Sequence, residues 1–258
     1  MKQMNICILM TACINPNGMA YTALQDAKER EMQYKNALYY YLEKTNVPII
    51  FVENTSHDIS TEYQRWIDND RLEYLCFDGN NYNKELGKGY GEYLLLQYAL
   101  ANSKILNNSR YVLKITGRLK VDNINQLLND KFILFDNVCR CEFLCDWFLK
   151  SVVVLLFVKH LSFFVQNDAF MINDSKHISF EHVLHDSLAK HSNIRLIPYF
   201  RPIKINGISG TFNKPYEVPT WKDNLKNNIS GANYFHKQSG NFPYRVFFML
   251  VNKITKYL

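Results

Sequence analysis

An apolar strand pattern at residues 111–115 stops abruptly at groups that could do chemistry. They are a hydroxyl, a glycine and three cations: Thr116, Gly117, Lys114, Arg118 and Lys120. In open α/β sheets, ligands bind at the carboxyl ends of strands. A glycine there lets backbone approach a ligand closely, and a guanidinium binds phosphate through two parallel hydrogen bonds. We therefore expect an anionic, phosphorylated ligand at this strand end.

A second candidate is the stretch Leu86-Gly-Lys-Gly-Tyr-Gly-Glu92, in a glycine-bearing loop before a helix that runs to residue 101. Backbone amides at a helix start attract phosphate, and Lys88 adds a mobile charge. The spacing is neither a P-loop nor a dinucleotide fingerprint, so a plain flexible loop is the alternative. The phosphate interpretation depends on Arg118 lying on the same side of the sheet.

Two carboxylates, Asp168 and Glu181, are candidate general bases. Glu181 lies near the start of a helix predicted at 178–191, with Ser179 as its N-cap. The helix dipole stabilises an anion there, which is also the ordinary structural reason for a glutamate. Asp168 opens a short predicted strand that ends at Ile172. Nucleophile chemistry has no support, because Ser209 lacks the G-x-S-x-G spacing; residues 202–216 are predicted to be a loop next to the ligand.

The elements that must position these groups alternate between strand and helix. Strands are predicted at 5–10, 48–53, 73–77 and 111–115, and helical segments at 20–44, 63–68 and 84–101. Such βαβ units indicate an α/β fold with a mainly parallel sheet and right-handed crossovers. All these strand ends then lie on one rim, which collects Thr11, Asn15, Glu53, Asn54, Asp78, Lys88, Thr116 and Arg118.

After Asp122 the pattern loosens, with a strand-like run at 132–138 and a buried strand or core helix at 152–158. We expect one domain over 1–241, with a nucleotide side at 1–122 and an acceptor side at 123–241. Residues 242–258 form a basic amphipathic helix pattern. Such a helix is suited to a membrane interface or to docking on the protein's own core, and its pattern does not separate the two.

Composition narrows the partners. The net charge is +6 and hydrophobic residues make up 47% of the chain, which favours a well-filled core and anionic partners such as nucleotide phosphates or an anionic membrane. A basic patch interleaved with aromatics is missing from the sequence, so nucleic acid is not expected. No secretory signal is evident, so the six cysteines indicate free thiols in a reducing cytoplasm. The cluster Cys139, Cys141 and Cys145 has no second ligand pair, which argues against zinc.

Taken together, the chain resembles bacterial glycosyltransferases of the GT-A type found in capsule and O-antigen loci. The matching pieces are the strand 6–11 with its Asn15-Pro16 loop, Glu53-Asn54, Gly87-Lys-Gly-Tyr-Gly-Glu92, Lys114-Ile-Thr-Gly-Arg118, the Asp168 strand and Phe180-Glu181-His182. The resemblance implies a nucleotide-diphosphate sugar as donor. By position, Thr11, Asn15 and Glu53 would hold the nucleoside and Lys88 the diphosphate. The full donor-side set is Thr11, Asn15, Glu53, Asn54, Asp78, Lys88, Lys114, Thr116, Gly117, Arg118 and Lys120.

One departure from that family concerns metal. GT-A enzymes commonly carry Asp-x-Asp after the fourth strand, whereas this chain has Thr116-Gly117-Arg118. Arg118 and Lys120 could neutralise a leaving diphosphate directly, because the electrostatic task is the same. We therefore expect no cofactor, with Asp122 as the nearest carboxylate if Mg²⁺ or Mn²⁺ is recruited.

The expected function is transfer of a sugar from a nucleotide-sugar to a lipid-linked or growing surface-polysaccharide acceptor. The enzyme would lie in the cytoplasm, peripheral to the inner face of the cell membrane. Glu181, with Asp168 as the second candidate, would deprotonate the acceptor hydroxyl if the reaction inverts. The alternatives are a nucleotidyltransferase using the same rim and a non-catalytic nucleotide-sugar-binding subunit of a glycan assembly complex.

Overall fold

The structure, a computed structural model, describes residues 5–20, 22–129, 138–145, 148–190, 194–199 and 201–223, together with 225 and 227. In the first half the elements are β1 (Ile6–Ala12), α1 (Ala27–Lys44), β2 (Ile49–Glu53), η1 (Ser60–Tyr63), α2 (Gln64–Ile67), β3 (Leu72–Cys76), η2 (Lys84–Leu86), α3 (Gly87–Asn102), α4 (Lys104–Asn108) and β4 (Tyr111–Thr116). In the second half they are β5 (Lys120–Val121), α5 (Ile124–Leu128), β6 (Val138–Cys145), β7 (Phe148–Phe157), α6 (Val158–Asn167), η4 (Ala169–Met171), η5 (Asp174–Lys176), α7 (Phe180–Lys190), β8 (Arg195–Pro198) and β9 (Ile205–Asn206).

Within the described residues, the central sheet has seven strands in the order β3-β2-β1-β4-β7-β6-β8. The pairs β3–β2, β2–β1, β1–β4 and β6–β8 are parallel, whereas β7 runs antiparallel to both neighbours. The predicted α/β fold with a mainly parallel sheet is therefore confirmed. The run at 152–158 is mostly strand, as part of β7, and not a core helix.

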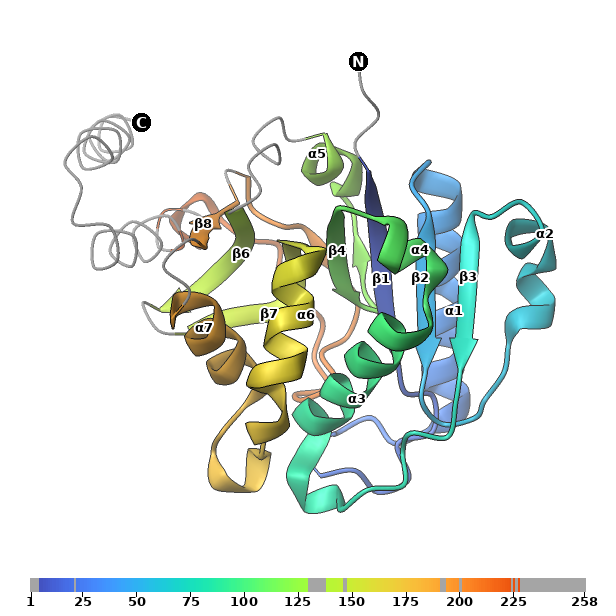
Figure 1. The fold of residues 1–258 in the computed structure, drawn as a ribbon, viewed down its shortest axis with the longest axis horizontal. Helices are drawn as coiled ribbons and strands as arrows, with labels where there is room; N and C mark the ends of the chain where they lie inside the picture. Colours follow the sequence, from blue (N-terminus) through green and yellow to red (C-terminus); the bar gives the residue numbers. More distant parts are fainter. Residues whose placement is uncertain are drawn as a thin grey trace.

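Helices cover both faces of this sheet (Figure 1). Apolar residues alternate between the faces along each strand, so β1 contributes Cys7 and Leu9 to one core cluster and Ile8 and Met10 to the other. Helices α3, α4, α6 and α7 complete the first cluster, and α1 and α5 complete the second. Two fully packed faces fix the strand register, because a slip of one residue would exchange the faces of all side chains.

The strand order creates a switch point between β1 and β4. From β1 the chain moves outward to β2 and β3, and then returns across β1 to form β4 on its other side. The crossovers that follow β1 and precede β4 therefore leave in opposite directions. A crevice forms at such a point, outside the carboxyl ends of the two strands, and open α/β sheets bind their ligands there.

Several predicted elements need correction. The first helix begins at Ala27 and not at residue 20, with the Asp26 side chain accepting from the Glu29 amide at 2.8 Å. No loop separates the glycine motif from its helix, since α3 starts at Gly87 itself. The strand predicted at 168–172 is the single turn η4. The predicted run at 132–138 and the helix pattern at 242–258 lie outside the described residues, apart from Val138, which begins β6.

Of the helices in the described ranges, none combines the length and apolar character that a bilayer crossing requires. The cysteines described there, Cys7, Cys13, Cys76, Cys139 and Cys141, are free thiols.

Candidate functional site

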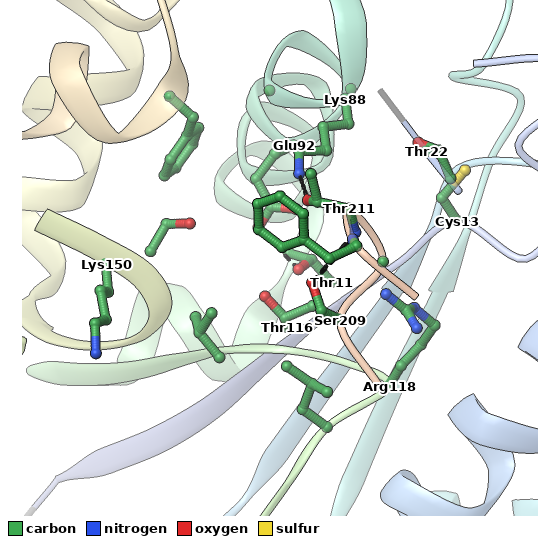
Figure 2. Close-up of a pocket in the computed structure, with 18 of the residues that line it drawn as sticks. Thr11, Cys13, Thr22, Lys88, Glu92, Thr116, Arg118, Lys150, Ser209 and Thr211 are labelled. Carbon is green, nitrogen blue, oxygen red and sulfur yellow. Dashed lines mark hydrogen bonds between the residues drawn. The ribbon is translucent and has the colours of Figure 1, made fainter. Parts of the chain in front are cut away.

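A cavity of about 650 Å³ lies at the switch point, where Thr11 stands at the end of β1, one residue before Ala12, and β4 ends in Thr116. Its other walls come from the first turns of α3 and α7, the start of β7 and residues 209–223. Because β7 runs antiparallel to β4, its first residues, rather than its last, reach this rim. The volume falls within the 300–1,000 Å³ range usual for small-molecule sites. Figure 2 shows this cavity with Thr11 and Thr116 on its floor.

Arg118 lines the cavity just after β4 and is 8% exposed. Its Nη1 donates to the Gln33 side-chain oxygen at 2.8 Å and to the Ile208 carbonyl at 3.3 Å. Both acceptors are neutral, so neither cancels the guanidinium charge. Its Nε is buried with no hydrogen-bond partner among the residues that the structure describes. A desolvated cation with a donor to spare is what an anionic ligand would satisfy.

Asn54 lines the same cavity immediately after β2 and is fully buried. Its backbone is fixed on both sides, because its amide donates to the Ala12 carbonyl at 3.2 Å and its carbonyl accepts from the Gly79 amide at 3.0 Å. Its side-chain oxygen and nitrogen have no partner within the described ranges. A buried polar group left unsatisfied costs about 1–3 kcal/mol, so such groups usually face a ligand or ordered water.

A three-residue network joins β1, α3 and β4 beneath the cavity. The Thr11 hydroxyl donates to Oε1 of Glu92 at 2.8 Å, and Nζ of Lys114 lies 2.6 Å from the same oxygen. Lys114 also donates to the Ser151 carbonyl at 3.0 Å. Lys114 is 4% exposed, and its charge is neutralised by Glu92. Lys114, which was predicted on the donor side, thus lines the cavity as a cation paired with Glu92.

Lys88 stands in the first turn of α3 and donates to the Thr211 hydroxyl across the cavity mouth (Figure 2). The contact joins α3 to the loop 202–216, which was predicted to lie next to the ligand. That segment does border the cavity, through Ser209, Gly210, Thr211, Phe212 and Tyr216 among others. Lys88 is exposed and has a long flexible stem, so it can leave Thr211 for a stronger anionic partner.

The start of α3 is occupied by a carboxylate of the protein itself. Oδ2 of Asp174 accepts from the Gly89 amide at 3.1 Å. Gly87 has φ +80°, and a Cβ there would lie 2.2 Å from the same oxygen. Burial raises the pKa of the Asp174 carboxyl, as does the nearby charge of Glu181. The backbone phosphate cradle expected at this helix start is therefore occupied by Asp174, and Lys88 is the cation that the motif brings to the cavity, alongside Gly89, Gly91 and Glu92.

Glu181 lines the cavity from the first turn of α7. Its Oε1 accepts from the Ser151 hydroxyl at 2.7 Å, which leaves Oε2 available. Ser179 precedes the helix, and its hydroxyl accepts from the His182 amide at 3.4 Å, as its predicted N-cap role requires. Asp168 lies elsewhere, at the end of α6, where its carbonyl accepts from the Met171 amide at 3.0 Å. Of the two predicted carboxylates, only Glu181 is among the described residues lining the cavity.

Several predicted donor-side residues lie outside the cavity lining. Glu53 is fully buried, and its carboxylate accepts from the backbone amides of Ile14, Thr55 and His57, which makes it the anchor of two loops rather than a ligand contact. The Asn15 amide donates to the Thr55 hydroxyl at 3.3 Å. The other predicted donor-side residues outside the lining are Asp78, Gly117 and Lys120, and Asp122, the candidate metal carboxylate, lies outside it as well.

The structure shows what surrounds each of these four residues. Asp78 borders a separate shallow cavity of about 460 Å³. A Cβ on Gly117 would lie 2.6 Å from the Thr11 carbonyl oxygen, so glycine allows β1 and β4 to close together. Lys120 lies over the ring of Tyr40. Asp122 is exposed near the same ring. Burial of the Tyr40 phenol raises its pKa, and the negative charge of Asp122 raises it further.

The sequence interpretation missed Glu92, Asp174, Lys150 and Ser151, which all line the cavity. Glu92 follows Lys88 by one helical turn, so helix periodicity could have placed both on one face. The other three carry no local signal. Lys150 and Ser151 reach the rim only because β7 is antiparallel, and Asp174 reaches it through a turn that follows α6.

A divalent metal of the kind expected for GT-A enzymes does not fit the β4 exit. Thr116, Gly117 and Arg118 present a hydroxyl, no side chain and a guanidinium there. Because the guanidinium is a buried cation, it would repel a metal cation at the same place. Asp122, the carboxylate considered for a metal, does not border the cavity. Across the described ranges, no group of three or more histidine, cysteine or acidic side chains is gathered as a metal site would require.

Comparisons with known proteins add likenesses in structure. No family model matches the chain, and no curated protein matches it. Among solved structures, it is similar to the inositol-1-phosphate CTP transferase of T. maritima, with 12% identity, 88% of this chain and 96% of that chain covered, and a TM-score of 0.47. It is also similar to the S. cerevisiae mannosyltransferase Ktr4p, with 9% identity, 90% and 82% covered, and a TM-score of 0.43.

A third similar structure is the galactosyltransferase LgtC in complex with donor and acceptor sugar analogues. Identity is 12%, coverage is 74% of this chain and 73% of that chain, and the TM-score is 0.41. These likenesses include both glycosyl and nucleotidyl transferases and have TM-scores below 0.5. They carry no conclusion about the reaction, which has to be argued from the cavity itself.

Proposed function

We propose that this protein is a GT-A type glycosyltransferase that moves a sugar from a nucleotide-diphosphate sugar to a lipid-linked or growing surface polysaccharide, as in capsule or O-antigen synthesis. One observation carries the proposal. Two side chains that follow β2 and β4, Asn54 and Arg118, line one cavity on either side of β1, and both hold buried polar atoms without a protein partner in the described ranges. A ligand that is polar at one end and anionic at the other would satisfy both.

The diphosphate is assigned to Arg118 and Lys88. Arg118 offers a desolvated guanidinium whose only acceptors in the described residues are neutral, and Lys88 offers a mobile ammonium at the mouth. Negative charge grows on the diphosphate as its bond to the sugar breaks. Arg118, held in a partly water-excluded site, stabilises that charge without reorganisation, and Lys88 adds a second cation by leaving Thr211. The nucleoside then extends toward Asn54, whose amide can donate to and accept from a base or ribose.

For an inverting reaction, Glu181 is assigned as the base. The acceptor oxygen forms a bond to the anomeric carbon, the bond from that carbon to the diphosphate oxygen breaks, and the acceptor proton passes to the Glu181 carboxylate. Ser151 holds one carboxylate oxygen, so the other can meet the acceptor hydroxyl. Asp168 is set aside for this role because it does not line the cavity.

Metal independence follows from the same charges. Because Arg118 and Lys88 are cationic, they can neutralise the leaving diphosphate themselves. A cytoplasmic enzyme acting on a lipid-linked acceptor would work at the inner membrane face, and the basic amphipathic pattern at 242–258, outside the described residues, would support that placement.

The test pairs binding with turnover. Calorimetry with UDP, GDP and CMP should reveal a nucleotide that binds, and the matching sugar nucleotide should be slowly hydrolysed and, with a lipid-linked acceptor, transferred. Release of pyrophosphate from a nucleoside triphosphate and a sugar 1-phosphate would instead establish nucleotidyl transfer. Binding without any turnover would identify a non-catalytic subunit. Each of those two outcomes, or no nucleotide binding at all, would overturn the proposal.

A further inference from the structure

Two segments that border the cavity carry most of the exposed apolar side chains. Eight large hydrophobic residues are strongly exposed in the described part of the chain, and six of them lie within 170–178 or 212–221. They are Phe170, Met171, Ile178, Phe212, Val218 and Trp221. Single exposed hydrophobics are ordinary, but six gathered on two short segments are a surface that calls for a partner. We refer to these six residues as the apolar rim.

Both segments come close to the start of α3, the second through Thr211, the residue just before it. Thr211 accepts from Lys88, and Asp174 accepts from the amide of the next residue, Gly89. Both segments therefore flank one turn of helix at the mouth of the same cavity, and Figure 1 shows η5 beside the first turn of α3. A partner on the apolar rim would stand directly at that mouth.

The exposed fractions favour a bilayer over a protein as this partner. Phe212 is 74% exposed, Val218 75% and Trp221 69%, so most of each side chain lies in solvent, although Phe212 also borders the cavity. A protein partner would need a separate pocket for each, whereas the acyl boundary of a membrane accepts isolated apolar side chains at any position. Tryptophan is also enriched at membrane interfaces, because its ring is apolar with one polar edge.

Exposed cations accompany the apolar rim. Lys176 lies in the first segment and Lys214 and Lys222 in or next to the second, and all three are exposed. Nζ of Lys222 lies 5.8 Å from the centre of the Trp221 ring, so a positive charge stands next to the most membrane-suited side chain of the apolar rim. Each cation near an anionic leaflet contributes about 1 kcal/mol to binding. The exposed carboxylates in or next to the same two segments are Glu217 and Asp223.

We propose that the apolar rim is a membrane-docking surface that sets the cavity mouth against an anionic lipid bilayer. This inference rests on the proposed function, because it takes the acceptor of the sugar to be lipid-linked. The acceptor's sugar or diphosphate headgroup would reach the cavity between the two segments while its lipid stays in the membrane.

The test is sedimentation of the full chain with vesicles of phosphatidylcholine and phosphatidylglycerol at 7:3. Replacing Phe212, Val218 and Trp221 together by serine should lower vesicle affinity roughly tenfold or more, because their apolar area no longer leaves water. The matched control is Met32→Ser with Tyr39→Ser, which removes two side chains 56% and 54% exposed on α1 and should leave affinity unchanged. Pure phosphatidylcholine should bind the wild type more weakly.

A fluorescence measurement tests whether the Trp221 side chain itself contacts the lipid. Brominated lipids in the same vesicles should quench the wild type, and Trp221→Phe should keep the affinity but lose most of that quenching. Unchanged affinity of the triple-serine variant would assign membrane binding to residues 242–258 and overturn the inference. A wild type that ignores the vesicles but self-associates through the apolar rim would overturn it as well. Nucleotide binding is measured without lipid, so failure of the docking surface and failure of the proposed reaction are separate results.

Discussion

The ammonium of Lys114 lies 2.6 Å from the carboxylate of Glu92, and the pair bridges the middle of the sheet to α3. The side chain of Lys114 is 5% exposed and that of Glu92 20%. Each charge satisfies the other in a poorly solvated place. The same carboxylate oxygen accepts from Thr11, so the end of β1 is held by the pair as well. The floor of the cavity is thus fixed before any ligand enters.

Glu92→Gln should destabilise the fold by about 3–5 kcal/mol, since it leaves the Lys114 ammonium buried without a counter-charge. Urea unfolding measures the loss. The matched control is Glu31→Gln, which breaks a more exposed pair with Lys35 along α1 and should cost about 0–1 kcal/mol. Equal losses in the two variants would mean that Lys114 is solvated well enough to need no partner.

Arg118→Ala should weaken donor binding or turnover by about 2–4 kcal/mol, because a preorganised charge for the diphosphate is lost. Calorimetry with the nucleotide diphosphate and kcat/KM with the sugar donor both report it. Lys120→Ala is the control, since that cation lies over Tyr40 and outside the cavity lining. Similar losses for both cations would indicate a general field effect and remove Arg118 from the site.

Glu181→Gln should lower kcat about 10²–10⁴-fold while donor affinity stays near that of the wild type, because glutamine keeps the shape but cannot accept the acceptor's proton. Asp168→Asn serves as the comparison and should leave kcat unchanged. A full rate in the Glu181 variant would point to a retaining reaction or to another base.

Turnover should survive excess EDTA. Arg118 and Lys88 supply positive charge to the leaving diphosphate, so a metal is not needed for that task. The assay compares initial rates in EDTA with rates after Mg²⁺ or Mn²⁺ is added back. Complete loss of activity on chelation, restored by metal, would contradict the proposal and direct attention to the carboxylates that border the cavity.

The pH dependence of stability should report on Asp174. Burial raises the pKa of this carboxyl in the folded protein, so ionisation is harder there than in the unfolded chain. Its contribution to stability is fully present below the ordinary value of about 4 and is lost as the pH rises through the folded pKa. Relative to Asp174→Asn, the wild type should therefore lose stability as the pH rises from about 4. Urea unfolding across pH would contradict this if the difference stayed constant or reversed.

The parallel half of the fold was predictable because its signals are local. The strands β1, β2, β3 and β4 are apolar runs separated by helical segments, and each begins or ends within about two residues of its predicted place. The rim then follows from parallel topology alone, and it brings Thr11, Asn54, Lys88 and Arg118 to one cavity.

The rest depended on contacts between distant parts of the chain. Glu53 follows a strand as a ligand-binding residue would, but loop amides turn its carboxylate inward. The pattern at 168–172 looks extended, yet the chain reverses there, and the Asn173 amide donates to the Ile178 carbonyl at 2.8 Å. Pairing with β4 and β6 sets the direction of β7, and this direction brings Ser151 to Glu181. The residues of β7 themselves contain no sequence signal for that direction.

Gly87 and Asp174 pack against each other, although the strands β4, β5, β6 and β7 lie between them in the sequence. A Cβ at 87 would lie 2.5 Å from the Cβ of Asp174 and 2.2 Å from its Oδ2. The backbone of Gly87, at φ +80°, would strain any other residue whatever side chain stands at 174. Selection on this chain should therefore keep glycine at 87 even in lineages where 174 has changed.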